Sequence, residues 1–523
     1  MPPERPSGGL RPSLRMKRIV LVLLLLAGTA MRVYKFPSLP VGLHQDEISE
    51  AYESYSLLHT GADRWGYHLP VYFLSWGSGQ NVLQSYLSIP VIAITGLTRV
   101  GVRLIPLLCG ILCLPLLFLT VRRWHGEAAA FLALFFLAFS PWQVMLSRWG
   151  IENSPLPFFM LLGLFTFGKA LDSSSYWAIL PSLLPFSLAF YTYGIVVVLI
   201  PSLLIFLFLI DLRSIAKARA AWLSALGLFS VLSLPIAFFV LKNYITKTNY
   251  SFERWLPFSV PLLPVTRLAE AEAEKIRSTP FRHNLYFLRH GLYDNTTWFE
   301  VPGFHPLPLI VLFLAAIGIA CLGWRLLCER RLSEPFLPWL FACIPLLIGI
   351  PLNNSRGIAL FVPLLALAGV GFVVVFDRFR RPAYKATWAF VCILLLLIPT
   401  VRFIYAYFGS TYTSEIADTF YPELPEAFQA VQKLAATSTP VYVSHEITLN
   451  YLQTLYFMKI DPSVFQHSGA TYNHPDFGPY RFSRASLAET PKPFIFLLRS
   501  NESPLCAASN TVSVGQFVVG ECR

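Results

Sequence analysis

The chain has 523 residues, of which 55% are hydrophobic and only 13% are charged. Soluble chains carry about 25% charged residues, so this composition excludes an ordinary soluble protein and indicates a polytopic α-helical membrane protein. The net charge of +12 could indicate a nucleic-acid partner, but the basic residues lie in short loops between apolar segments. We therefore expect the chain to lie in a lipid bilayer and to bind no nucleic acid.

Apolar segments that are long enough for a bilayer core recur along the chain, since each crossing needs about 20 residues. They predict about eleven transmembrane helices, at residues 18–35, 100–120, 127–145, 155–169, 176–192, 194–210, 220–241, 306–327, 336–352, 357–376 and 386–407.

Basic clusters between these segments all fall on one predicted side, which the positive-inside rule assigns to the cytoplasm. Residues 1–17 are then a cytoplasmic N-terminal segment, and residues 18–407 form a multi-pass domain in the cell inner (plasma) membrane. The opposite side receives a large first extracytoplasmic loop, 36–99, and a second long loop, 242–305, in which 268–276 has the composition of a polar helix.

The first extracytoplasmic loop opens with an adjacent pair of carboxylates, Asp46 and Glu47. Apolar positions from Glu47 to Leu58 recur at helical spacing, which predicts an amphipathic helix at the membrane interface. Asp46 could simply cap that helix, with Glu47 as a first-turn acid. Alternatively, the pair could perform acid–base chemistry on a lipid-borne substrate, because ionisable groups at a membrane edge are often functional. His44 is a candidate hydrogen-bond partner or ligand, so a divalent metal is possible although no cofactor is certain.

Two arginines are expected on the outer face, where positive charge is otherwise sparse. Arg148 lies in a tight turn between two predicted spans, and Arg356 lies at the start of a late span. Each could be a snorkelling residue or a bidentate phosphate ligand, and the carboxylate pair on the same face favours the phosphate role for Arg356. Glu152 is a further site candidate or a local ion-pair partner of Arg148. His305, which precedes a proline at a span entrance, is a boundary residue or a site residue.

After the last span, the composition becomes that of a soluble domain. We expect a small extracytoplasmic α/β domain over residues 408–523 with an accessory or substrate-recognition role. Its predicted elements are a helix at 425–436 and strands at 441–443, 494–498 and 516–519. Cys506 and Cys522 could pair, which would contribute roughly 3 kcal/mol, or could remain free thiols.

An ordered set of motifs resembles the bacterial GT-C membrane glycosyltransferases of the protein O-mannosyltransferase and aminoarabinose transferase (ArnT-like) type. The resemblance covers roughly residues 18–376. The motifs are Leu43 to Glu47, Ala51-Tyr52, Ser56 to Leu58, Thr60-Gly61, Ser88-Ile89-Pro90, Val102-Arg103-Leu104, Pro141-Trp142 and Ser147-Arg148 through Glu152-Asn153.

The resemblance implies a transferase that moves a hexosyl or pentosyl group from a polyprenyl-phosphate donor to an extracytoplasmic acceptor, usually with inversion. The acceptor could be a protein, a lipid or a glycan of the cell envelope. The resemblance maps the essential acid/base residue onto Asp46 and a supporting acid onto Glu47, and it maps a carrier-phosphate ligand onto Arg356. The chain departs from the pattern at 79–83, where relatives often carry a lysine.

Two other classes of function remain as alternatives. A transporter or flippase for a lipid-linked or polar substrate would place ionisable residues near the middle of spans, whereas here they cluster at span ends. A non-catalytic relative would bind a glycan or a lipid through its C-terminal domain.

Overall fold

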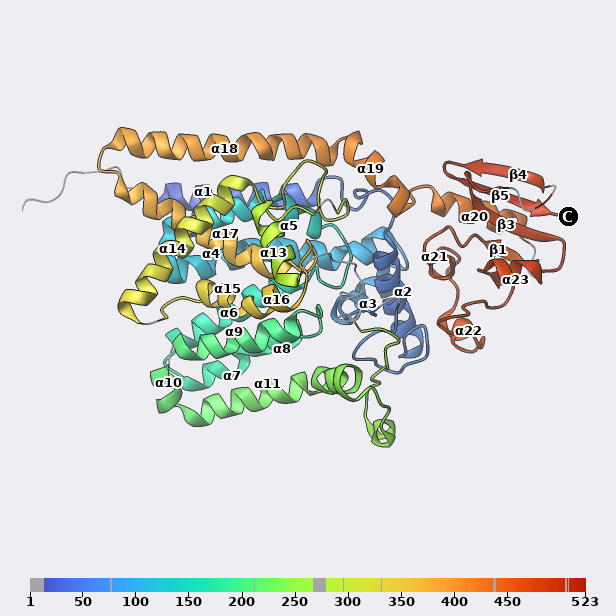
Figure 1. Ribbon diagram of the computed structural model, residues 1–523, viewed down its shortest axis with the longest axis horizontal. Helices are drawn as coiled ribbons and strands as arrows, with labels where there is room; N and C mark the ends of the chain where they lie inside the picture. Colours follow the sequence, from blue (N-terminus) through green and yellow to red (C-terminus); the bar gives the residue numbers. More distant parts are fainter. Residues whose placement is uncertain are drawn as a thin grey trace, which may run out of the picture.

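The computed structural model describes residues 14–523 except 76–77, 211, 267–278, 295, 331, 436–438, 504–505 and 507. The molecule is elongated, with a helical body over most of its length and a sheet domain at one end (Figure 1). The first thirteen residues of the predicted cytoplasmic segment and the predicted polar helix 268–276 lie outside the described residues.

The helical body is built from long apolar helices and pairs of short ones. The long helices are α1 (Leu14–Val33), α4 (Arg99–Ala138), α6 (Leu156–Asp172), α9 (Val196–Ile210), α11 (Arg219–Val240), α14 (Leu309–Glu329), α17 (Ile358–Arg378) and α18 (Pro382–Phe408). The shorter helices are α5 (Pro141–Leu146), η1 (Tyr176–Ala178), α7 (Ile179–Ser182), α8 (Leu184–Ala189), α10 (Leu212–Lys217), η2 (Leu241–Thr246), η3 (Ser251–Trp255), α13 (Pro280–Arg289), α15 (Phe336–Ala342) and α16 (Ile344–Gly349).

Each predicted span overlaps between one and three of these helices. In the described part of the chain, five helices are long and apolar enough to cross a membrane, and they are Arg99–Ala138, Arg219–Thr246, Leu309–Glu329, Ile358–Arg378 and Pro382–Phe408. The prediction of a polytopic helical membrane protein is therefore confirmed, whereas the number of eleven crossings stays a prediction.

The predicted spans 100–120 and 127–145 lie in the two arms of α4, which meet at Gly126. The arms fold back on each other, because the ring centroids of Phe118 and Phe131 are 5.2 Å apart and a Cβ atom added at Gly28 would contact both Leu114 and Ala138. Gly126 has φ 84° and ψ 176°, a backbone conformation that other residues rarely adopt, so the two arms of α4 meet at a glycine kink.

The centre of the body is α17, which packs closely against α14 and α4. A Cβ atom added at Gly371 would lie 1.9 Å from the carbonyl oxygen of Leu314, and one added at Gly318 would lie 2.2 Å from that of Leu367. Small residues thus allow the backbones of α14 and α17 to approach each other, as is common between membrane helices.

The segment 36–99 contains α2 (Gln45–Thr60) and α3 (Leu83–Thr95), which lie between the helical body and the sheet domain (Figure 1). The predicted helix is confirmed and is buried against protein on nearly all sides. Its predicted place at the membrane interface stays a prediction. The C-terminal domain covers α2, and the hydroxyl of Tyr52 donates to the carbonyl of Ile460 at 2.9 Å.

The C-terminal domain contains a five-stranded sheet of order β2-β1-β3-β5-β4. Its strands are β1 (Val441–Val443), β2 (Tyr480–Arg481), β3 (Phe494–Arg499), β4 (Ala508–Val514) and β5 (Phe517–Cys522), and its helices are α19 (Ser410–Phe420), α20 (Leu424–Leu434), α21 (Asn450–Phe457), α22 (Pro462–Gln466) and α23 (Arg484–Ala488). β1 runs parallel to β2 and β3, whereas β5 is antiparallel to β3 and β4.

The predicted helix and the three predicted strands of this domain are confirmed. Cys506 and Cys522 form a disulfide, with their Cα atoms 5.9 Å apart. The bond ties the segment that precedes β4 to the end of β5.

Candidate active site

A polar cavity of about 260 Å³ opens at the start of α2. Its lining residues come from segments far apart in the sequence and include Asp46, Gln80, Glu152, Asn153, Tyr193, Trp298 and Ser355. Asp46 and Glu152, two of the predicted candidates, therefore face the same cavity, with the side chain of Asp46 31% exposed.

Asp46 is held in place by the N-terminal cap of α2. The cap residue is His44 rather than Asp46, so the predicted capping role of Asp46 is corrected. The Asp46 amide donates to His44 Nδ1 at 3.2 Å, and the Glu47 carboxylate accepts from the His44 amide at 3.1 Å, which completes a capping box. The His44 ring packs against Trp149 and Phe420, with ring centroids 5.3 Å apart in both pairs. The carboxylate of Asp46 does not cap the helix and lines the cavity, where it can contact a ligand.

Glu47 points in a different direction from Asp46 and is completely buried. Its two carboxylate oxygens accept from Nε and Nη2 of Arg103, each at 2.7 Å, and Oε1 also accepts from the Gly150 amide at 3.0 Å. Arg103 donates further to the carbonyls of Pro40 and Gly42. This geometry does not support the predicted contact of Glu47 with substrate, because its oxygens are engaged by the protein.

Arg148 is also buried, and it lies among the residues that join the body to the C-terminal domain. Its Nη1 donates to the Arg32 carbonyl at 2.6 Å, and its Nη2 donates to the Leu39 carbonyl at 3.1 Å. The guanidinium lies 5.4 Å from the ring centroid of Phe408. Arg148 is not among the lining residues of the Asp46 cavity, so its placement favours a structural role over the predicted phosphate contact.

Glu152 accepts a hydrogen bond from the Asn81 amide in the wall of the Asp46 cavity. The expected local ion pair with Arg148 is not what the structure shows, since the nitrogens Nη1 and Nη2 of Arg148 bind backbone carbonyls elsewhere. Glu152 therefore contributes negative charge to the cavity of Asp46.

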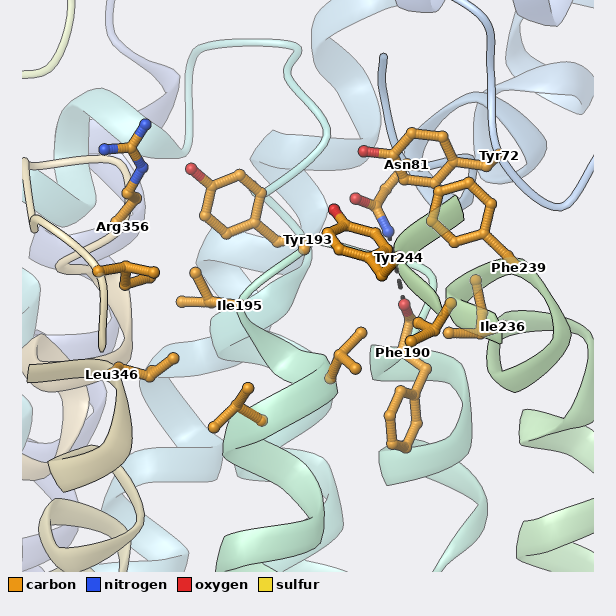
Figure 2. Close-up of a pocket in the computed structure, with 15 residues that line it drawn as sticks. Tyr72, Asn81, Phe190, Tyr193, Ile195, Ile236, Phe239, Tyr244, Leu346 and Arg356 are labelled. Atoms are coloured by element: carbon orange, nitrogen blue, oxygen red, sulfur yellow. Dashed lines mark hydrogen bonds between the residues drawn. The ribbon is translucent and has the colours of Figure 1, made fainter. Parts of the chain in front are cut away.

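A second cavity of about 310 Å³ adjoins the first one and is mostly apolar. Figure 2 shows Arg356, Tyr193 and Asn81 toward one end of this cavity, with Ile195 and Leu346 below them. Tyr193 lines both cavities, so the polar end of the apolar cavity meets the chamber of Asp46.

A network of hydrogen bonds holds the turn that carries Arg356. The Asn354 amide donates to Asp294 Oδ2 at 2.6 Å, and Nδ2 of the same residue donates to Asp294 Oδ1 at 3.0 Å and to Glu300 Oε2 at 2.8 Å. Tyr193 shares a hydrogen bond of 2.8 Å with Ser355 Oγ. The turn is thus fixed to the long loop on one side and to the shared wall of the two cavities on the other.

His305 lies apart from this pair of cavities, among whose lining residues it does not appear. Its ring packs edge-on against Tyr293, with centroids 5.6 Å apart. Burial lowers the pKa of His305, which favours the neutral imidazole. These observations favour a boundary role for His305 over a site role.

A buried acidic cluster lies behind Asp46 on α2, and the sequence interpretation missed it. Glu50, Glu53 and Asp63 are all buried, with Arg64 as the adjacent cation. Arg64 lies 3.3 Å from Glu53 Oε1, whereas Glu50 accepts from the hydroxyl of Ser85. Burial raises the pKa of Glu50 and of Asp63 well above their usual values. The spacing of Glu50 and Glu53 behind Asp46 was a signal, because residues three and four positions apart share a helix face.

The described residues contain no group of three or more His, Cys, Asp and Glu side chains suited to a metal ion. The divalent metal considered from the sequence therefore gains no ligand set from this part of the chain.

Comparison with known proteins places the fold. Residues 82–238 match the family model described as dolichyl-phosphate-mannose-protein mannosyltransferase. No curated protein sequence matches the chain. Asp46 lies outside the matched range, so its position rests on the geometry above.

Solved structures match nearly the whole length of the chain. The structure of ArnT from Cupriavidus metallidurans in the apo state has a TM-score of 0.58 at 14% identity, covering 96% of this chain and 97% of that chain. The same protein bound to undecaprenyl phosphate has a TM-score of 0.57 at 15% identity, covering 97% of each chain.

An oligosaccharyltransferase from Archaeoglobus fulgidus, tethered to an acceptor peptide containing the NVT sequon, has a TM-score of 0.52 at 15% identity and covers 93% of this chain and 69% of that chain. The predicted resemblance to GT-C membrane glycosyltransferases is thus confirmed, and the fold is GT-C-like with a small C-terminal sheet domain.

Proposed function

We propose that this protein is a membrane glycosyltransferase that moves a sugar from a polyprenyl-phosphate donor to an acceptor outside the cytoplasm. The observation that carries the proposal is the junction of two cavities at Tyr193, one apolar with Arg356 at its polar end and the other polar with Asp46 in its wall. A lipid-linked sugar has the same division into an isoprenoid chain, a phosphate and a hydroxyl-rich head.

The apolar cavity suits the first isoprene units of the donor, because its lining is largely aliphatic and aromatic. Arg356 would bind the phosphate, since a guanidinium matches phosphate oxygens and neutralises the charge of the leaving group. The sugar would then extend past Tyr193 into the chamber of Asp46.

In the proposed reaction, an acceptor hydroxyl oxygen attacks the anomeric carbon as the bond from that carbon to the phosphate oxygen breaks. The hydroxyl proton passes to the Asp46 carboxylate, and the bonding electron pair leaves with the polyprenyl phosphate, which Arg356 stabilises. A single displacement inverts the anomeric configuration. The hydrogen bonds of His44 and the buried pairing of Glu47 hold the start of α2 and thereby position Asp46.

The comparisons support the transferase over the transporter alternative, because the matched family model describes a mannosyltransferase and an oligosaccharyltransferase shares the fold. The A. fulgidus oligosaccharyltransferase with this fold is tethered to an acceptor peptide, which supports a transfer to an acceptor. We further propose that residues 408–523 lie on the extracytoplasmic side, with the N-terminus in the cytoplasm.

The test uses purified protein in lipid nanodiscs with undecaprenyl-phosphate-linked hexoses and pentoses that are labelled in the sugar. Membranes of the expressing cell supply the acceptor, and transfer of label and release of undecaprenyl phosphate are both measured. We expect Asp46→Asn to lower transfer by roughly 10²- to 10⁴-fold, the usual contribution of a general base, without changing thermal stability. The matched control is Glu415→Gln, which removes an exposed acid from α19. Asp46→Asn protein with wild-type transfer would overturn the catalytic assignment.

Arg356→Ala tests the phosphate role separately. We expect it to weaken binding of undecaprenyl phosphate by about 10- to 100-fold, because a charge-assisted hydrogen bond contributes about 1.5–3 kcal/mol. Arg289→Ala, which removes an exposed arginine from the nearby α13, is the control. Equal binding by the Arg356→Ala and Arg289→Ala proteins would contradict the proposed donor pose.

A further inference from the structure

The C-terminal domain contains its own cavity, which the transfer reaction does not use. It has a volume of about 690 Å³, within the usual range of about 300–1,000 Å³ for ligand sites. Its lining includes Tyr442, His445, Glu446, Arg484, Asn501 and Glu502.

The strand order explains why a cavity forms at this place. β1 and β3 are parallel neighbours, so their carboxyl ends lie at the same edge of the sheet. After β1 the chain leads to β2 on one side, whereas after β3 it leads to β4 and β5 on the other. The connections diverge and leave a crevice between the two strand ends, which is where open α/β sheets bind ligands.

The residues that follow the two strands are joined across this crevice. Ser444, directly after β1, donates through its amide to the Leu497 carbonyl at 2.9 Å and through its hydroxyl to Glu502 Oε2 at 2.8 Å. Glu502 Oε1 accepts from the Arg499 amide at 2.7 Å. The floor of the crevice is therefore built by hydrogen bonds between the loops, with Glu502 held in place.

The walls of the crevice carry groups that can still bind a ligand. His445 Nε2 lies 3.3 Å from Glu446 Oε1, and the side chain of Glu446 is 52% exposed. His445 Nδ1 shares a hydrogen bond of 3.2 Å with the hydroxyl of Tyr442. Arg484 is exposed at the start of α23 and lines the same cavity. The cavity thus offers both carboxylate acceptors and a guanidinium donor.

The charges discriminate between ligand classes. Glu446 and Glu502 give the cavity two carboxylates against the guanidinium of Arg484, so an anionic ligand would be repelled on one side. An apolar ligand would leave these polar groups unpaired. A ligand with many hydroxyl groups fits, because each hydroxyl can donate to a carboxylate and accept from a guanidinium or an amide.

We propose that the crevice between the carboxyl ends of β1 and β3 binds a neutral oligosaccharide through Glu446 and Arg484. The site is distinct from the Asp46 chamber, with which it shares no lining residue. Through this site the C-terminal domain recognises a glycan, which is either the acceptor itself or the cell-envelope polymer that carries the acceptor. The choice of a glycan rests on the proposed transferase, whereas the binding can be measured without transfer.

The test is binding of the full-length protein in nanodiscs to an array of neutral and acidic oligosaccharides of three to six residues, followed by titration of the best neutral ligand. We expect selective binding of neutral glycans, weakened about tenfold or more by Glu446→Gln and by Arg484→Ala. Both side chains are exposed, so the variants keep their fold. The control is Glu426→Gln, which removes an exposed acid from α20.

The Asp46→Asn protein separates this proposal from the proposed reaction, because it should bind the neutral glycan with wild-type affinity while its sugar transfer is lowered by roughly 10²- to 10⁴-fold. Binding of acidic glycans alone, binding unchanged in both crevice variants, or no glycan binding by the wild-type protein would each overturn the proposal.

Discussion

The buried pair of Glu47 and Arg103 gives the sharpest prediction, because the sequence and the structure assign different roles to Glu47. The sequence interpretation makes Glu47 a supporting acid of the reaction. In the structure, Glu47 is fully buried and accepts from Arg103, Gly150 and His44. A structural role predicts that its removal destabilises the protein, whereas a purely catalytic role predicts a stable, inactive protein.

The expected loss of stability follows from the partners that Glu47→Ala would leave buried without a counter-charge. Removing one member of a buried ion pair costs about 3–5 kcal/mol, because the remaining charge stays buried without compensation. A typical domain has a net stability of about 5–15 kcal/mol, so this single change removes a large share of it. The matched control is Asp172→Asn. Asp172 forms an ion pair with Arg123, but its side chain is 58% exposed, so this pair should contribute only about 0–1 kcal/mol to stability.

The assay is thermal unfolding of the detergent-solubilised protein, followed by intrinsic fluorescence, together with the yield of monodisperse protein in size-exclusion chromatography. We expect Glu47→Ala to lose most of the yield and to unfold well below wild type, whereas Asp172→Asn unfolds with wild type. A Glu47→Ala protein with wild-type unfolding and no transfer activity would refute the structural reading and restore the catalytic one.

Three further predictions follow from the described contacts. Burial raises the pKa of Glu50 above its usual value of 4.5, so its contribution to stability is present at low pH and is lost as the pH rises through the raised pKa. Glu50→Gln should flatten this fall in thermal stability with rising pH, and an unchanged pH profile would contradict the prediction. Cys506→Ser opens a loop of 16-residue separation and should lower the stability of the C-terminal domain by about 3 kcal/mol, measured by protease resistance against the Cys321→Ser control. Asn354→Asp places a third carboxylate beside those of Asp294 and Glu300 and should raise the KM for the donor more than about tenfold. If Asn354→Asp raises the KM no more than Asn354→Ala does, repulsion between the carboxylates is not the cause.

The elements of the fold were largely predictable because they are local. Apolar runs of membrane length mark the helices of the body, and short runs of β-branched and aromatic residues such as 441–443 mark the strands of the sheet. The two arms of α4 were predictable as separate spans, because Gly126 and the polar residues near it have the composition of a short turn. Only the packing shows that the arms lie side by side, with the ring centroids of Phe118 and Phe131 5.2 Å apart.

The candidate site was predictable only in part, because the side chains that decide it are partners from distant segments. Arg148 and Arg356 look alike in sequence, each an arginine in a polar turn beside a span. The structure separates them, since Arg148 is buried against backbone carbonyls and Arg356 lines the apolar cavity. No local pattern distinguishes an arginine that will be buried against distant backbone carbonyls from one that will face a ligand.

Arg103 shows the same limit from the other direction. It belongs to one of the quoted motifs, but nothing in its neighbourhood indicates that it binds a carboxylate 56 positions earlier in the chain. A charged residue in the first turn of a predicted membrane helix is ordinarily assigned to the interface. Its burial becomes visible only when α2, α4 and the turn at Gly150 are assembled.

The separation of Asp46 from Glu47 follows from helix geometry, and it explains how one dipeptide supplies both a reacting group and its support. Consecutive residues of an α-helix point about 100° apart, so two adjacent acids in the first turn can be directed to different partners. The cap at His44 fixes the rotation of α2, and that rotation directs Glu47 to Arg103 and Asp46 to the chamber. Because the ion pair of Glu47 resists any rotation of the helix start, it also fixes the direction of the Asp46 carboxylate, which a general base requires to meet the acceptor hydroxyl.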